Sequence, residues 1–146
     1  MFGKILIPTD GSEHTKEAVD KALELAKCTG GRVTALYVID QTLFINVPVD
    51  SAVTTVYAIL KKEGQAAVDY VKEQGSSIGV QVDTKVLDGQ PVKTILEEAK
   101  GHDLIVMGTL GRTGVSKLLM GSVAEKVMKL SHVPVLVVRS PEVDKK

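Results

Sequence analysis

The chain has 146 residues, of which 44% are hydrophobic and 25% are charged. This length is typical of one domain with a sizeable core, and the composition is that of an ordinary globular protein. The formal net charge of zero argues against a nucleic-acid partner, because binding to phosphate backbones generally needs a basic surface. We therefore expect a single domain over residues 1–146.

The number of cysteines and the length of the hydrophobic runs indicate the cellular compartment of the protein. The single cysteine, Cys28, excludes an internal disulfide and is typical of a reducing environment, and we expect its thiol to be packed in a helix. The N-terminal apolar run stops at Pro8, which makes it too short for a signal peptide. No run approaches the roughly 20 residues of a membrane span. The expected location is cytoplasmic, with no membrane partner.

Strand and helix patterns alternate along the first half. Residues 4–8 are typical of a buried strand, and the helix after them ends at Gly30. A second strand is predicted over 32–39. An irregular apolar connector at 41–51, which something must cover, leads into a long helix over about 52–74. The side chains expected to face inward from the two helices are Ala18, Val19, Ala22, Leu23, Ala26, Val56, Ile59, Leu60, Ala67, Tyr70 and Val71.

The second half continues the alternation. Residues 80–87 alternate as a half-buried strand near a sheet edge does, and a short helix follows with Pro91 in its first turn. An apolar run at 104–107 predicts a fourth strand, and 133–138 predicts a fifth. Residues 140–146 form a polar tail that we expect to be frayed.

Five strands alternating with four helices predict an open, Rossmann-like parallel sheet with helices on both faces. Ligands of such sheets bind beyond the carboxyl ends of the strands, where the winding reverses. Two strand-end loops carry unusual residues, namely 9–12 and 108–121. They form one site only if the first and fourth strands are neighbours. The order 3-2-1-4-5, which we predict, makes them neighbours; the flavodoxin-like order 2-1-3-4-5, which the residues alone leave open, does not.

The loop after the fourth strand is unusually long for a compact domain. Its glycines are Gly108, Gly111, Gly114 and Gly121. Glycines let backbone amides approach a ligand, and Ser122, three residues before Glu125, has the spacing of a capping box at a helix start. A helix N-terminus supplies unpaired N–H groups and partial positive charge. The loop therefore predicts an anion site, with phosphate as the favoured anion.

Several polar residues near these loops have a second interpretation. Asp10 could simply cap a helix, in capping-box spacing with Glu13. Arg112 suits bidentate contact with a phosphate but could equally face solvent, and Lys117 fits a solvated residue better. Ser122 could be only an N-cap. We expect the three histidines, which are His14, His102 and His132, to be surface or cap residues, and we expect no metal site built by the protein.

The loop fits neither a Walker A motif nor a dinucleotide fingerprint, but it has the spacing G-x2-G-x9-G-S over 108–122. With that spacing, Pro8-Thr9-Asp10 after the first strand, and Pro134 to Val138 at the end, the chain resembles the universal stress protein family over residues 2–140. The resemblance implies the 3-2-1-4-5 sheet and dimerisation through the fifth strand. It also implies binding of ATP, or of AMP or ADP, with Mg or Mn held through the phosphates.

By that resemblance, Asp10 would lie near the ribose or adenine, and the backbone of Val38 would meet the adenine. Glycines 108 and 111 would line the ribose and phosphates, and residues 121–123 would hold the phosphates. The complete implied nucleotide-binding set is Pro8, Thr9, Asp10, Val38, Gly108, Gly111, Arg112, Gly121, Ser122 and Val123. Two departures, Leu110 and Ala124, replace polar residues that ATP-binding relatives can carry.

The apolar fifth strand would lie at a sheet edge, where an uncovered strand risks aggregation. Pairing of residues 133–139 with the same strand of a second subunit would cover it, whereas the 41–51 connector or the tail is the alternative cover. We therefore predict a dimeric, ATP-binding stress-response protein with at most slow hydrolysis. The alternatives are a ligand-free interaction protein and, less favoured, an adenylating or ATP-cleaving enzyme, because residues 9–14 match neither H-x-G-H nor S-G-G-x-D-S.

Overall fold

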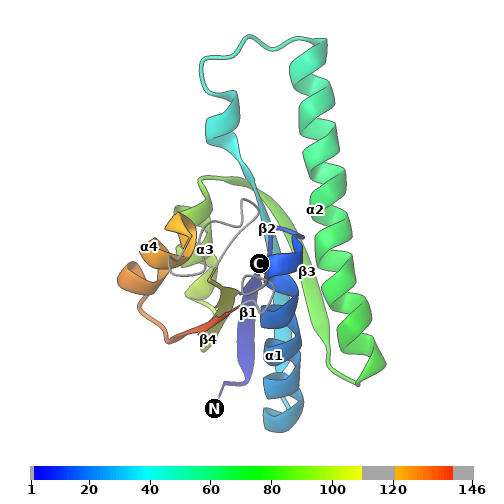
Figure 1. The fold of residues 1–146 in the computed structure, drawn as a ribbon, viewed down its shortest axis with the longest axis vertical. Helices are drawn as coiled ribbons and strands as arrows, with labels where there is room; N and C mark the ends of the chain where they lie inside the picture. Colours follow the sequence, from blue (N-terminus) through cyan, green and yellow to red (C-terminus); the bar gives the residue numbers. More distant parts are fainter. Residues whose placement is uncertain (1, 110–120, 140–146) are drawn as a thin grey trace, which may run out of the picture.

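The computed structural model describes residues 2–109 and 121–139 and contains one parallel sheet flanked by helices (Figure 1). The strands are β1 (Lys4–Pro8), β2 (Arg32–Asp40), β3 (Val82–Gly89), β4 (Leu104–Gly108) and β5 (Val135–Val138). The helices are α1 (Glu13–Thr29), α2 (Ser51–Ser77), α3 (Pro91–Ala99) and α4 (Ser122–Leu130), with a short 3-10 helix, η1 (Gln41–Phe44). The strand order is β3-β2-β1-β4-β5, with every pair parallel, which confirms the predicted order.

A hydrophobic core lies on each face of the sheet. Because successive strand residues point to opposite faces, Ile5 and Ile7 pack against α1 and α2, whereas Leu6 packs against α3 and α4. All three side chains are fully buried. The inward face predicted for α1, from Ala18 to Ala26, is also buried. Helices therefore cover both faces, as predicted, and the carboxyl ends of the central strands open at one edge.

Two strand boundaries differ from the sequence pattern, and local hydrogen bonds explain both. The third strand begins two residues late because the Val80 N–H donates to the Gly75 carbonyl oxygen (2.8 Å) at the end of α2. The fifth strand also begins two residues late, at Val135. Here the Ser131 hydroxyl donates to the Val133 carbonyl oxygen (2.7 Å) and accepts from the Val133 N–H (3.0 Å), which holds a turn.

The expectation of a packed Cys28 thiol is wrong. Cys28 is exposed, because two helical positions beyond the buried Ala26 is nearly the opposite face of α1. His102, expected to be a surface or cap residue, is half-buried and caps the last turn of α3. Its Nδ1 lies 2.8 Å from the Glu98 carbonyl oxygen and its Nε2 lies 2.9 Å from Thr34 Oγ1. This ring therefore ties the end of α3 to β2.

The first half of α2 extends, together with η1 and the connector between them, beyond the ends of the strands (Figure 1). We call residues 41–60 the arm. Val56 and Ile59, expected to face inward, are 46% and 51% exposed. The inward face of α2 passes instead through the neighbouring positions Tyr57 and Leu60, which are half-buried and pack against the core. The arm is nevertheless tied down at its base: the rings of Phe44 and Tyr57 meet edge to face at 6.2 Å between centroids.

The Tyr57 hydroxyl also donates to the Asp88 carboxylate at the end of β3, at 2.9 and 2.8 Å to its two oxygens. This hydrogen bond raises the pKa of Tyr57 above its ordinary value, and the Asp88 charge adds to the effect. The bond needs the protonated phenol. Its contribution is therefore complete below the ordinary tyrosine pKa of about 10 and is lost as the pH rises through the raised value.

We expect the tyrosinate absorbance near 295 nm to show one late-titrating phenol. Tyr57→Phe should remove that component, and Asp88→Asn should return the Tyr57 pKa toward its ordinary value. A titration in which Asp88→Asn leaves every phenol pKa unchanged would contradict this tie between α2 and β3.

Within the described residues, no helix has the length and apolar character needed to cross a membrane.

Candidate functional site

The loop between β1 and α1 is fixed by its threonines. The Thr9 N–H donates to the Leu36 carbonyl oxygen (2.9 Å), which holds the loop against β2. The Thr9 Oγ1 accepts from the Gly11 N–H (3.1 Å) and lies 3.2 Å from the Thr15 hydroxyl. Thr15 in turn donates to the Ser12 carbonyl oxygen (2.9 Å). The loop therefore presents its side chains in one defined arrangement.

Asp10 does not cap α1 as the capping-box spacing suggested. The N-cap residue is Ser12, and one Asp10 carboxylate oxygen accepts from the Ser12 N–H (2.9 Å), which makes a turn two residues long. Gly11, between them, has φ of +79°, a conformation that favours glycine. The turn leaves Asp10 at the rim of a cavity beyond the carboxyl end of β1.

The two ends of the glycine loop meet beyond β4. The Thr109 N–H donates to the Val138 carbonyl oxygen (3.1 Å), and the Gly121 N–H donates to the Thr109 carbonyl oxygen (2.6 Å). Gly121 is consequently extended (φ −63°, ψ 153°) and is itself the N-cap of α4. The interpretation of Ser122 as the N-cap is therefore wrong, and so is its capping box with Glu125, because Ser122 is the first helical residue.

Residues 110–120 of the predicted loop lie outside the described residues. They include Leu110, Gly111, Arg112, Gly114 and Lys117. What the structure places is the helix that follows them: the first turn of α4 starts at the cavity, and the N–H groups at a helix start have no partner within the helix. These groups carry partial positive charge, so the cavity has an anion-favouring wall independent of any side-chain cation.

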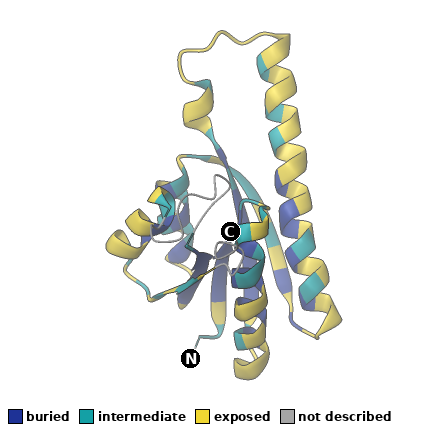
Figure 2. Cartoon of the chain, in the orientation of Figure 1, coloured by how far each residue is buried: buried dark blue, intermediate teal, exposed yellow. Residues whose placement is uncertain are grey.

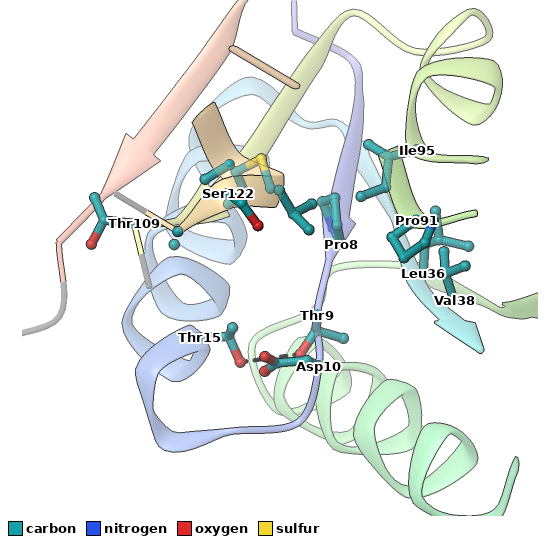
Figure 3. Close-up of a pocket in the computed structure, with 15 residues that line it drawn as sticks. Pro8, Thr9, Asp10, Thr15, Leu36, Val38, Pro91, Ile95, Thr109 and Ser122 are labelled. Carbon is teal, nitrogen blue, oxygen red and sulfur yellow. Dashed lines mark hydrogen bonds between the residues drawn. The ribbon is translucent and has the colours of Figure 1, made fainter. Parts of the chain in front are cut away.

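The cavity has a volume of about 320 Å³ and lies at the carboxyl ends of β1, β2 and β4 (Figure 3). Eight predicted site residues line it, namely Pro8, Thr9, Asp10, Val38, Gly108, Gly121, Ser122 and Val123. Residues far apart in the sequence therefore meet in one place, because β1 and β4 are neighbours in the sheet.

The cavity has an apolar end and a polar end (Figure 3). The apolar end is lined by Pro8, Leu36, Val38, Pro91 and Ile95, and the polar end by Thr9, Asp10, Thr15, Thr109 and Ser122. Among the described lining residues, Asp10 is the only ionisable side chain. This division suits a ligand with a flat apolar group at one end and hydroxyl and anionic groups at the other.

Sequence reasoning missed part of the lining. Leu36 and Met107 were assigned only to buried strands. Met107 stands near the carboxyl end of β4, and Leu36, in the middle of β2, pairs in register with Pro8 at the end of β1. Pro91 and Ile95 come from the first turns of α3, which the parallel topology brings to the same edge as the glycine loop. Pro91 was recognised as a helix start, so the predicted strand order could have placed it at the site.

The described residues contain no group of three His, Cys, Asp or Glu side chains able to hold a metal ion.

The chain belongs to the universal stress protein family, whose model matches residues 1–139. It is 44% identical over 144 residues to the universal stress protein MJ0531 of Methanocaldococcus jannaschii, and the match covers 97% of this chain and 85% of the relative. Among solved structures it is similar to MJ0577 of the same archaeon, with a TM-score of 0.83, 32% identity and coverage of 95% of this chain and 96% of that one. The family membership agrees with the fold.

A universal stress protein family member of Arabidopsis thaliana, solved with AMP bound, also shares the fold. Its TM-score is 0.68 at 18% identity, and the match covers 94% of this chain and 91% of that one. At this identity the likeness shows the fold, and the bound AMP is a property of the plant protein.

Proposed function

We propose that this universal stress protein binds an adenine nucleotide in the cavity and acts as a nucleotide-dependent regulator of a stress response. The observation that carries the proposal is the cavity with one apolar and one polar end, closed at the polar end by the start of α4. Its volume of about 320 Å³ lies at the lower end of the range for small-molecule sites. The AMP bound to a plant member of the fold supports the choice of an adenine nucleotide.

The adenine would lie at the apolar end, against Leu36, Pro91 and Ile95, with the Val38 backbone supplying its polar contacts. The ribose would lie near Asp10 and Gly108. The phosphates would lie against Gly121 and meet the first N–H groups of α4, at Ser122 and Val123, because the Gly121 N–H already donates to Thr109. Gly111 and Arg112 would contribute from the glycine loop. An Mg or Mn ion would be bound through the phosphates.

Binding without efficient turnover fits the charges at the site. Phosphoryl transfer generally needs positioned cations and a group that orients the nucleophile. Asp10 is the only carboxylate among the described lining residues, and one of its oxygens already accepts from the Ser12 N–H. We therefore assign the site to ligand-dependent regulation with at most slow hydrolysis.

The exposed β5 edge supports a homodimer through residues 133–139. Leu136, in the middle of β5, is 42% exposed, and among the described residues β5 pairs only with β4. Pairing with the same strand of a second subunit would cover that edge and this side chain.

The test of the proposed function is the nucleotide content of freshly purified protein. The protein is denatured, and the supernatant is separated by ion-exchange chromatography. We expect ATP, ADP or AMP in near-stoichiometric amount. Protein that is empty, and that also ignores added AMP and ATP with magnesium at millimolar concentration, would contradict the proposal and favour a ligand-free interaction protein.

A further inference from the structure

The arm is largely exposed to solvent (Figure 2), and it lies outside the nucleotide site. Its exposed large apolar side chains are Leu43 (58%), Ile45 (59%), Val47 (42%), Val49 (88%), Val56 (46%) and Ile59 (51%). They lie within one stretch of the chain, at residues 43–59, on a segment that extends away from the sheet (Figure 1). Several exposed apolar side chains gathered on one segment are typical of an interaction site.

The arm carries almost no charge. Between residues 41 and 60 the only ionisable side chains are Asp50 and Tyr57. The Asp50 carboxylate accepts from the Val53 N–H (3.0 Å) and serves as the N-cap of α2. A nucleic acid, an anionic membrane or a strongly charged protein would therefore find no complementary charge on this surface.

The surface is held in a defined shape. At its start, the Asp40 carboxylate accepts from both the N–H and the hydroxyl of Thr42, at 2.9 and 2.6 Å. At its base, the Tyr57 hydroxyl is bonded to Asp88 and the Tyr57 ring contacts Phe44. A partner therefore meets apolar side chains that are already positioned, which reduces the entropy lost on association.

The arm also contains a hollow of about 470 Å³ between η1 and the start of α2. It is lined by Gln41, Phe44, Ile45, Val53, Thr54 and Tyr57. Val49, which is 88% exposed, belongs to the connector between the same two elements. One segment thus offers both an apolar hollow and a protruding apolar side chain.

We propose that the arm is an interface with a second copy of this chain, in which two arms pack around a twofold axis. A twofold contact places the same surface on both sides, so a charged patch would face its own charge, whereas an uncharged patch does not. The combination of a hollow and a protruding side chain on one arm is what such a self-complementary contact requires. The charge distribution thus favours a second copy over a charged partner.

The arm interface is separate from the proposed β5 interface. The arm continues from β2 into α2, which packs on β2 and β3, and β3 lies at one edge of the sheet while β5 lies at the other. The two contacts can therefore form together, and we expect a tetramer built from two kinds of twofold contact. The proposal does not depend on nucleotide binding.

Sedimentation velocity tests the arm interface in the full chain. Val49→Lys and Ile59→Lys each place a charge on the arm surface, at positions exposed enough for the fold to tolerate it. We expect each to halve the mass of the wild-type assembly. Gln65→Lys is the matched control, since Gln65 is exposed on the same helix but outside the arm, beside Asp69, and should leave the mass unchanged.

Leu136→Lys distinguishes the β5 interface from the arm interface, because it places a charge on β5 alone. If the wild type is a dimer that only Leu136→Lys dissociates, the strand interface stands and the arm proposal is overturned. A wild type that is monomeric at every concentration, or arm variants that sediment as the wild type does, would also overturn it. The wild type could also bind neutral phosphatidylcholine vesicles. If Ile59→Lys abolished that binding and left the mass of the assembly unchanged, a membrane surface would be the occupant of the arm and the arm proposal would be overturned.

Discussion

Replacing Gly121 by valine is expected to weaken binding of an adenine nucleotide about 100-fold, which corresponds to the loss of one or two charge-assisted hydrogen bonds. Gly121 lines the cavity immediately before the first turn of α4. Its backbone (φ −63°, ψ 153°) is extended, a conformation that valine adopts readily, so the fold should tolerate the change. The added side chain would keep phosphates away from the N–H groups. Titration calorimetry with AMP and with ATP and magnesium measures the effect.

The matched control is Gly101→Val. Gly101 precedes β4 at the opposite end of the strand, and a Cβ placed there lies 4.0 Å from the nearest non-neighbouring atom, the Glu98 carbonyl oxygen. We expect wild-type affinity. Equal affinity of both variants and the wild type would show that the nucleotide does not approach α4, and equal losses in both would point to a general effect on folding.

Replacing Gly64 by alanine is expected to lower the free energy of unfolding by about 1–3 kcal/mol, the usual effect of overpacking a core. Alanine at an ordinary helix position would instead stabilise by about 1 kcal/mol relative to glycine. At Gly64 a Cβ would lie 2.5 Å from the ring of Tyr37, which is 5% exposed on β2. The ring has little space to move. Urea denaturation measures the change.

Ala58→Gly is the control for the direction of this change in the free energy of unfolding. Ala58 lies six residues before Gly64, in the exposed half of α2. There we expect a loss of about 1 kcal/mol from helix propensity alone. Glycine should therefore be the better residue at position 64 and the worse one at position 58. A stabilising Gly64→Ala would contradict the close packing of α2 on β2 that fixes the base of the arm.

The sheet and most of the cavity could be predicted because the responsible residues act locally. Buried strands read as short apolar runs, and their alternation with helices predicts parallel pairing. Parallel pairing then brings the ends of β1 and β4 to one edge, which places Thr9 and Asp10 beside Gly108 and Gly121. The strand order itself needed the family resemblance, since the pattern alone left two orders open.

The misses have a common cause in tertiary structure. Val56 and Ile59 were assigned to the inward face of α2, but in the arm that face passes through Tyr57 and Leu60, which pack against the core. Apolar residues at neighbouring helical positions do not by themselves decide which of them faces the sheet. The N-cap of α4 is Gly121 rather than Ser122, because a hydrogen bond to the Thr109 carbonyl oxygen holds Gly121 in an extended conformation. A hydrogen bond between the two ends of a long loop cannot be predicted from a sequence pattern.

The most direct measurement is the titration of uniformly ¹⁵N-labelled protein with AMP, followed through the amide resonances. The account predicts that the largest shifts fall on Thr9, Asp10, Val38 and residues 121–124, with small changes in the arm and at the start of β4. Shifts confined to another surface, or no shifts at millimolar AMP, would contradict the assignment of the cavity as an adenine nucleotide site.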